Sequence, residues 1–126
     1  MKVFDTNHIL RFILKDNLDQ AYAAKKILDE NEVYIPYEVI AEAVYVMIKV
    51  YKIDKKAVVD TIGDFLRIEN VRTDSPLVTR KCLYYYRENS LDFVDCLLCA
   101  YQIVGGYEVC TFDKKLNKLI ERETHN

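Results

Sequence analysis

The chain has 126 residues, 51% of them hydrophobic, and its 20 Asp and Glu against 18 Lys and Arg give a formal net charge of −2. This length and apolar fraction suit one domain with a sizeable core, so we expect a single domain over residues 1–126 and exclude a mainly disordered chain. The charge excludes a strongly basic nucleic-acid binder, and the longest run without Asp, Glu, Lys or Arg, residues 96–107, is too short to span a membrane.

The spacing of the apolar residues predicts strands and helices that alternate along the chain. Apolar side chains that recur every three to four residues indicate helices, and short apolar runs beside turn residues indicate strands. In chain order we expect a strand at 2–4, a helix from the Asp5-Thr6-Asn7 cap to about Leu14, a helix over 16–29, a strand at 33–35, helices over 37–51 and from Asp54, a weak strand at 70–72, helices over 76–88 and 91–104, a strand at 108–111 and a last helix from Lys114.

This order of elements predicts an α/β fold. Short apolar strands separated by helices form a parallel sheet with right-handed crossovers, and helices usually cover both faces of such a sheet. We therefore expect a helix-rich α/β/α sandwich around a short parallel central sheet.

The cysteines and the first residues both indicate a cytoplasmic protein. Cys96 and Cys99 form a C-x-x-C pair within an apolar run, but a zinc site normally needs a second such pair or paired histidines. We expect them to be small buried side chains. The first residues enter a strand at once and carry no long apolar segment that ends at a cleavage site, so we expect no secretory signal.

Acidic residues occur where a parallel sheet would bind a ligand, outside the carboxyl ends of its strands. Asp5 follows the first predicted strand, and Asp113 follows the last. Glu42 lies inside the apolar helix after the second strand. Asp95 lies in the apolar helix that begins near residue 91, and Asp92 precedes it by three residues, which places both on one face of that helix.

Each of these acids also has a simpler explanation. Asp5, Asp92 and Asp113 can cap the helices that follow them, and Asp95 is a first-turn acid favoured by the helix dipole. Glu42 can lie on a solvent-facing stripe. These explanations do not account for acids from four separated segments together, so we expect Asp5, Glu42, Asp95 and Asp113 to converge on one cleft.

Four motifs occur in a fixed order along the chain. They are Phe4-Asp5-Thr6-Asn7, Glu42 after the second strand, the run from Leu91 to Ala100, and Thr111-Phe112-Asp113. In order and spacing they resemble the motifs of PIN-domain nucleases, in particular the VapC-type toxin ribonucleases. The resemblance extends over roughly residues 1–118.

The resemblance implies a fold, an activity and partners. It implies a central parallel sheet between helices and the Mg- or Mn-dependent cleavage of single-stranded RNA. The acidic set that it carries over is Asp5, Glu42, Asp95 and Asp113. It further implies the toxin of a toxin–antitoxin pair, bound by a small antitoxin protein, and a homodimer.

The chain departs from the family pattern at two places. The family usually has a small residue directly after the third acid and again a turn later, where this chain has Cys96 and Cys99; cysteine is similar in size. The family also commonly ends with a fifth strand, for which residues 119–126 offer little signal.

The chemistry of the four acids favours a divalent cation. Clustered carboxylates repel one another, and a cation neutralises them. A donor set of oxygen atoms favours Mg²⁺ or Mn²⁺ over zinc. We expect Asp5, Asp95 and Asp113 to contact the metal, Glu42 to bind a second ion or to orient the attacking water, and Asp92 to be a reserve ligand.

Basic and aromatic residues around the acids have two interpretations each. Lys114, Lys115 and Lys118 follow Asp113 and form either a rim that attracts a phosphate backbone or an ordinary solvated helix face. The ten tyrosines either stack on unpaired bases and partner surfaces or simply complete the core and surface.

Two other functions compete with the nuclease. A PIN-like fold kept as a non-catalytic interaction module would dock a partner through its tyrosine-rich helices, although the loss of one or more acids would then be expected. A receiver-like phosphoacceptor domain would need a pair of acids after the first strand, where this chain has only Asp5.

Overall fold

The computed structural model describes residues 1–125, which divide into two compact units. Unit 1 extends over Met1–Asp74, and unit 2 begins at Ser75. Each unit has helices and a core of its own. The single domain over residues 1–126 stays a prediction.

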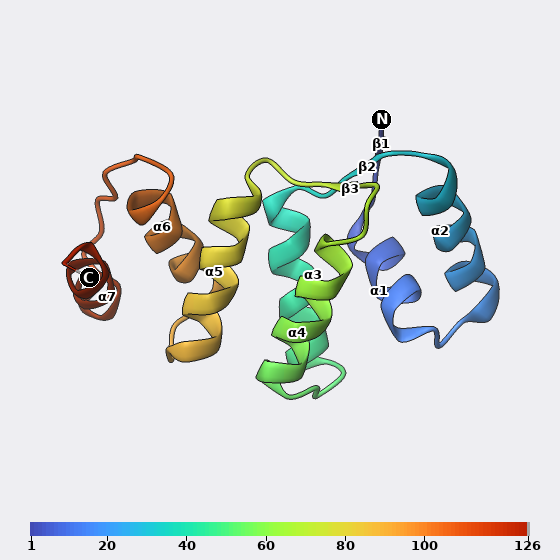
Figure 1. Cartoon of the computed structure of the whole chain (residues 1–126). Coiled ribbons are helices and arrows are strands. Elements are labelled where there is room, and N and C mark those ends of the chain that lie inside the picture. Colours follow the sequence, from blue (N-terminus) through green and yellow to red (C-terminus); the bar gives the residue numbers. More distant parts are fainter. Residues whose placement is uncertain (126) are drawn as a thin grey trace. The chain divides into compact units, whose positions relative to one another are not determined.

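Unit 1 contains a short parallel sheet (Figure 1). Its strands are β1 (Lys2–Val3), β2 (Val33–Tyr34) and β3 (Val71–Arg72), in the spatial order β1-β2-β3. Both pairings are parallel, as the sequence predicts, and Val33 is the register partner of Lys2 on one side and of Val71 on the other. Each strand has only two residues, so the sheet is small relative to the helices.

Four helices complete unit 1, namely α1 (Thr6–Leu14), α2 (Leu18–Glu30), α3 (Tyr37–Lys49) and α4 (Lys55–Leu66). Their starts follow capping rules, because the side chains of Asp5, Asn17 and Asp54 each accept a hydrogen bond from a backbone N–H of the following turn. Pro36 precedes α3 without a side-chain cap. The predicted boundaries differ from these by no more than two residues.

The core of unit 1 lies between the sheet and the helices. Phe4 and Ile35, which directly follow β1 and β2, are 2% and 0% exposed, and Ile40 of α3 is equally buried. Between α1 and α4, the rings of Phe12 and Phe65 have centroids 5.7 Å apart. These contacts fix the carboxyl ends of the strands, where the first acid lies.

Unit 2 is entirely helical apart from its loops, within the part of the chain that the structure describes. Its helices are α5 (Pro76–Glu88), α6 (Phe93–Ile103) and α7 (Lys114–Thr124). Ser75 caps α5 and Pro76 takes its first position, as predicted. Cys96 and Cys99 of α6 are both 0% exposed, which confirms that they are buried side chains.

The exit from α6 requires glycine. A Cβ at Gly105 would lie 2.5 Å from the carbonyl oxygen of Tyr101, and Gly106 has a φ of 80°. The helix therefore ends at this pair, as the sequence predicts, although its last helical residue is Ile103.

The strand predicted over residues 108–111 was wrong: residues 104–113, all described, form no strand. Side chains of unit 2 satisfy this backbone in place of a neighbouring strand. The Val109 N–H donates to Oε1 of Gln102 at 2.9 Å, and the Thr111 carbonyl accepts from Nδ2 of Asn117 at 2.9 Å. Asp113 thus follows a loop, and the prediction that it leaves a strand was also wrong.

The end of the chain is helical. Residues 119–124 belong to α7, so the described part of the region 119–126 forms no fifth strand, and Asn126 lies outside the described residues. The predicted fold class is confirmed: the described residues form seven helices and a three-stranded parallel sheet in a helix-rich α/β fold. None of the described helices has both the length and the apolar character needed to cross a membrane.

Candidate active site

Asp5 connects the sheet to α1. Its extended backbone, with φ −86° and ψ 177°, leaves β1, and its side chain caps the helix. Oδ1 accepts the backbone N–H of His8 at 2.9 Å and lies 2.9 Å from Nδ1 of the His8 ring. These bonds, the backbone one first, lower the pKa of Asp5, although its side chain is 69% exposed. Asp5 is therefore an ionised, oriented carboxylate at the surface.

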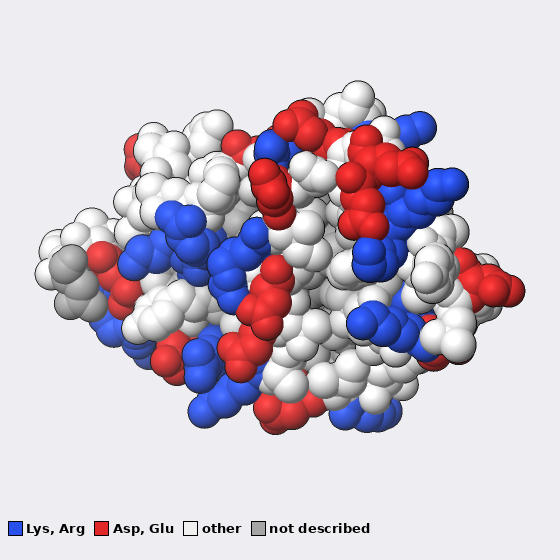
Figure 2. Space-filling view, turned by 45° about the vertical axis from the view of Figure 1, so that its right-hand side comes forward, with Lys and Arg blue, Asp and Glu red and all other residues white. Residues whose placement is uncertain are grey.

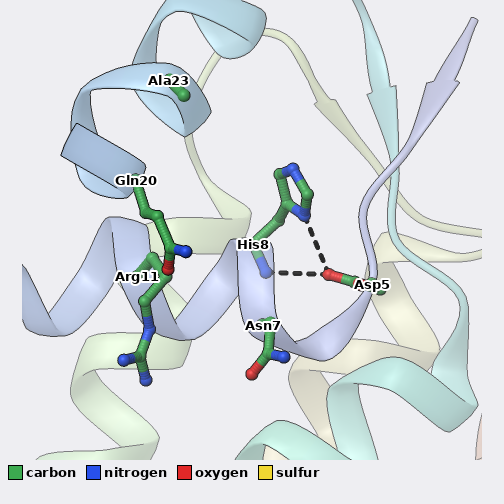
Figure 3. A pocket seen from close by; sticks show the side chains of 6 residues that line it. All are labelled: Asp5, Asn7, His8, Arg11, Gln20 and Ala23. Atoms are coloured by element: carbon green, nitrogen blue, oxygen red, sulfur yellow. Dashed lines mark hydrogen bonds and ion pairs between the residues drawn. The ribbon is translucent and has the colours of Figure 1, made fainter. Parts of the chain in front are cut away.

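A pocket of about 370 Å³ opens beside this carboxylate (Figure 3). Residues of the α1 start and of α2 line it: Asp5, Asn7, His8, Arg11, Gln20 and Ala23. The His8 ring also packs on Phe4, with centroids 5.2 Å apart. His8 was not among the candidate site residues predicted from the sequence. The available signal is its position three residues after a capping aspartate, since that spacing places both side chains on the first turn of the helix.

Arg11 lines the same pocket but is already paired. Its guanidinium lies within 3.0 Å of the Asp16 carboxylate and donates to Oη of Tyr51 at 2.7 Å. In Figure 3 the guanidinium lies apart from the Asp5–His8 pair. The side chain is only 18% exposed, so its first role is to tie α1 to the turn after α3.

Glu42 lies on α3, between turns whose buried residues include Ala43 and Met47. Its side chain is exposed, and it forms no hydrogen bond or ion pair with the residues that the structure describes. Glu38, one turn earlier, is exposed as well. This placement matches a solvent-facing stripe and leaves the carboxylate accessible to a ligand.

The other acids lie in unit 2, on α6 and α7, which pack against each other. Asp113 caps α7, and its Oδ1 accepts the Leu116 N–H at 2.8 Å. Asp92 precedes α6, but its side chain makes no capping hydrogen bond. Asp95 is in the first turn of α6 and is partly buried. Capping thus explains Asp5 and Asp113 as local structure, but it does not explain the side chains of Asp92 and Asp95.

Electrostatic repulsion connects the three aspartates of unit 2. Partial burial raises the pKa of Asp95 above its usual value, and the negative charges of Asp113 and Asp92 raise it further. Repulsion of this kind is eased by a cation, so it favours positive charge near Asp95. This repulsion is compatible with the predicted grouping of Asp95 with Asp113, which stays a prediction.

The four predicted acids are divided between the two units. Asp5 and Glu42 belong to unit 1, whereas Asp95 and Asp113 belong to unit 2. Within residues 1–125, no three His, Cys, Asp or Glu side chains form a cluster that could hold a metal ion. The joint action of the four acids stays a prediction.

The surface charge is mixed. On the face that Figure 2 displays, acidic and basic side chains are interspersed, so the small net charge does not conceal a large field of one sign there. On this face, attraction of a polyanion would depend on local groups of cations.

Comparison with known proteins supports the motifs. A search of curated proteins and a search of solved structures found no significant match. A family model described as "PIN domain" matches residues 2–121, which include all four acids and both units. PIN domains are generally nucleases, and they typically use divalent metal ions. Because the match covers nearly the whole length, the chain belongs to the PIN domain family.

Proposed function

We propose that this protein is a metal-dependent endoribonuclease that cleaves phosphodiester bonds of single-stranded RNA, with Asp5, Glu42, Asp95 and Asp113 as its catalytic acids. The observation that carries the proposal is the pair Asp95 and Asp113, on packed helices of one unit, whose charges oppose each other. A cation near Asp95 would offset this repulsion, and divalent cations are typical of the nuclease family to which the chain belongs.

The residues present fit Mg²⁺ or Mn²⁺ in their chemistry. All the acids offer oxygen donors, which hard cations prefer, and a cation beside Asp95 would offset the burial and repulsion that raise its pKa. Asp5, Asp95 and Asp113 would hold the ion. When bound, it would polarise the scissile phosphate and lower the pKa of an attacking water.

The chain's own residues orient these carboxylates. His8 holds Oδ1 of Asp5 through its backbone N–H and its ring, and the Leu116 N–H holds Oδ1 of Asp113. Fixed carboxylates need no reorganisation when the substrate arrives. Glu42, which is exposed and unpaired among the described residues, would orient the attacking water or bind a second ion. Asp92 would be a reserve ligand.

The biological role that we propose is that of a cytoplasmic toxin held inactive by an antitoxin protein. In support, α2 presents two large apolar side chains to solvent: Leu18 is 72% and Tyr22 78% exposed. Exposed apolar side chains on one helix suit a protein interface, either with an antitoxin or with a second copy in a homodimer.

The cleavage experiment uses an end-labelled single-stranded RNA, the purified chain, and Mg²⁺, Mn²⁺ or chelator. We expect cleavage only with metal, and a loss of at least about 100-fold in Asp95→Asn, because the charge that would bind the ion is removed. Asp60→Asn is the matched control, since Asp60 is an exposed acid on α4 outside the set, and it should cleave like wild type.

Equal cleavage by Asp95→Asn and wild type, or cleavage that survives chelator, would refute the proposed mechanism. Absence of any cleavage across several RNAs and both metals would instead favour the non-catalytic interaction module. The exposed Leu18 and Tyr22 of α2 would then be the first surface to test.

A further inference from the structure

Phe112 is an aromatic side chain held wholly in solvent. It is 104% exposed, more than any other large apolar residue described, and it lies in the loop directly before Asp113. Full exposure of a phenyl ring to water is unfavourable. Single exposed apolar side chains are common on protein surfaces, but this ring directly precedes a proposed catalytic acid, which makes it a candidate contact for the substrate.

The backbone on both sides of this ring is fixed. The Asp113 N–H donates to Oγ1 of Thr111 at 3.0 Å, and Nδ2 of Asn117 donates to the Thr111 carbonyl at 2.9 Å. Asp113 itself is fastened to the start of α7 through the Leu116 N–H. Phe112 therefore belongs to a hydrogen-bonded segment, and these bonds hold the backbone beside it close to the start of α7.

Three cations follow the ring within two turns of α7. Lys114, Lys115 and Lys118 are all exposed, and none forms an ion pair with the residues that the structure describes. Lys114 and Lys115 occupy the first turn, where the helix dipole disfavours positive charge. An arrangement that costs stability and concentrates positive charge suits an anionic ligand such as a phosphate backbone.

We propose that Phe112 stacks on an unpaired base of the RNA substrate, while Lys114, Lys115 and Lys118 hold the adjoining phosphates. The inference rests on the proposed ribonuclease function and assigns a binding residue to it. An aromatic ring beside several lysines is the combination that binds single strands, because every base has a face to stack on. A protein partner fits less well, since charged residues flank the ring on its C-terminal side.

A fluorescent variant tests the contact directly. The chain contains no Trp, so Phe112→Trp introduces a single tryptophan at this position. In the Asp95→Asn background, which prevents cleavage, a single-stranded RNA should quench this fluorescence, and a duplex of the same sequence should not. Tyr84→Trp is the control, because Tyr84 is 53% exposed on α5 and should not respond. Anisotropy of labelled RNA reports binding in parallel.

Kinetics give a second readout. Phe112→Leu keeps the apolar volume but loses the aromatic face, so its KM for single-stranded RNA should rise roughly 5- to 100-fold with little change in kcat. Phe112→Trp should have a KM nearer to that of wild type. Tyr84→Leu should leave KM unchanged.

Two results would overturn the inference, and a further observation would say what the ring does instead. RNA that binds the Phe112→Trp variant without quenching its tryptophan, or a Phe112→Leu variant with the KM of wild type, would show that the ring does not stack. A changed oligomeric state in Phe112→Leu with unchanged KM would assign the ring to a protein contact. The comparison of KM requires a wild type that cuts RNA, whereas the quenching does not; a wild type that never cuts RNA refutes the proposed function itself.

Discussion

Asp95 lies in the first turn of α6, partly buried, with two further aspartates acting on its charge. Its pKa is raised, by burial first and then by Asp113 and Asp92. Because the pKa of Asp95 is higher in the folded chain than in the unfolded chain, protonation of this carboxyl group favours folding. That favourable contribution is complete at a pH below the pKa in the unfolded chain, and it is lost as the pH rises through the pKa in the folded chain. At neutral pH the ionised Asp95 therefore destabilises the fold.

Asp95→Asn should accordingly raise the melting temperature at pH 7 while it abolishes cleavage. We expect a gain of about 2–4 °C, which shrinks at pH 3, where the carboxyl groups are protonated in both folded and unfolded chains. Thermal melts of the wild type and of the Asp95→Asn variant at pH 7 and pH 3 measure this difference in melting temperature. Added Mg²⁺ should narrow the difference at pH 7, because the cation stabilises only the charged site. A lower melting temperature for the variant at pH 7 would contradict the argument.

At the scale of elements, local chemistry predicted most of the helices. The caps Asp5, Asp54 and Ser75 are short-range signals, so the helix starts could be read from the sequence. The wrong strand at 108–111 has a different cause. Its residues favour a strand, but the partners of its backbone are side chains on α6 and α7, and no local pattern reveals them.

The packing of α5 on α6 predicts the reactivity of the thiols. Cys82, Cys96 and Cys99 are at most 1% exposed, whereas Cys110 lies exposed in the loop before α7. Burial raises the pKa of Cys99 to about 11 and raises that of Cys82 still more. Since the thiolate is the reactive form, these two should be inert in the folded chain.

In the native chain, one of the four thiols should therefore react rapidly with an aromatic disulfide reagent. In denaturant, the three buried thiols should become exposed and react as well. Absorbance of the released thiolate counts the reactive groups. Cys110→Ser should remove the rapid phase. Rapid reaction of more than one thiol in the native state would show that α5 and α6 separate readily.

At the scale of the whole molecule, family membership was predictable and the assembled site was not. The motifs around Asp5, Glu42, Asp95 and Asp113 are local, and a family match over residues 2–121 bears out the PIN resemblance. The partner of Asp5, His8, was missed because one histidine in a polar turn carries little signal alone. Charge coupling between Asp95 and Asp113 depends on how α6 meets α7, which residue spacing does not specify.

The proposed homodimer gives a prediction at this scale. Light scattering after gel filtration should yield twice the 14.8 kDa of one chain. Tyr22→Glu, which places a charge on the exposed side of α2, should shift the mass toward one chain, because burying an unpaired charge at an interface is costly. Tyr84→Glu on α5 is the matched control. A wild type that elutes with the mass of one chain would refute the dimer.

The loop between α6 and α7 has a consequence for how such a protein diverges. The backbone hydrogen bonds between two strands do not depend on which side chains the strands carry. This loop, by contrast, is held by the side chains of Gln102, Thr111 and Asn117. Single substitutions at these positions would re-aim Phe112 while leaving the buried residues of α6 and α7 untouched. During evolution, the preference for one RNA over another would then change faster than the helical fold of unit 2.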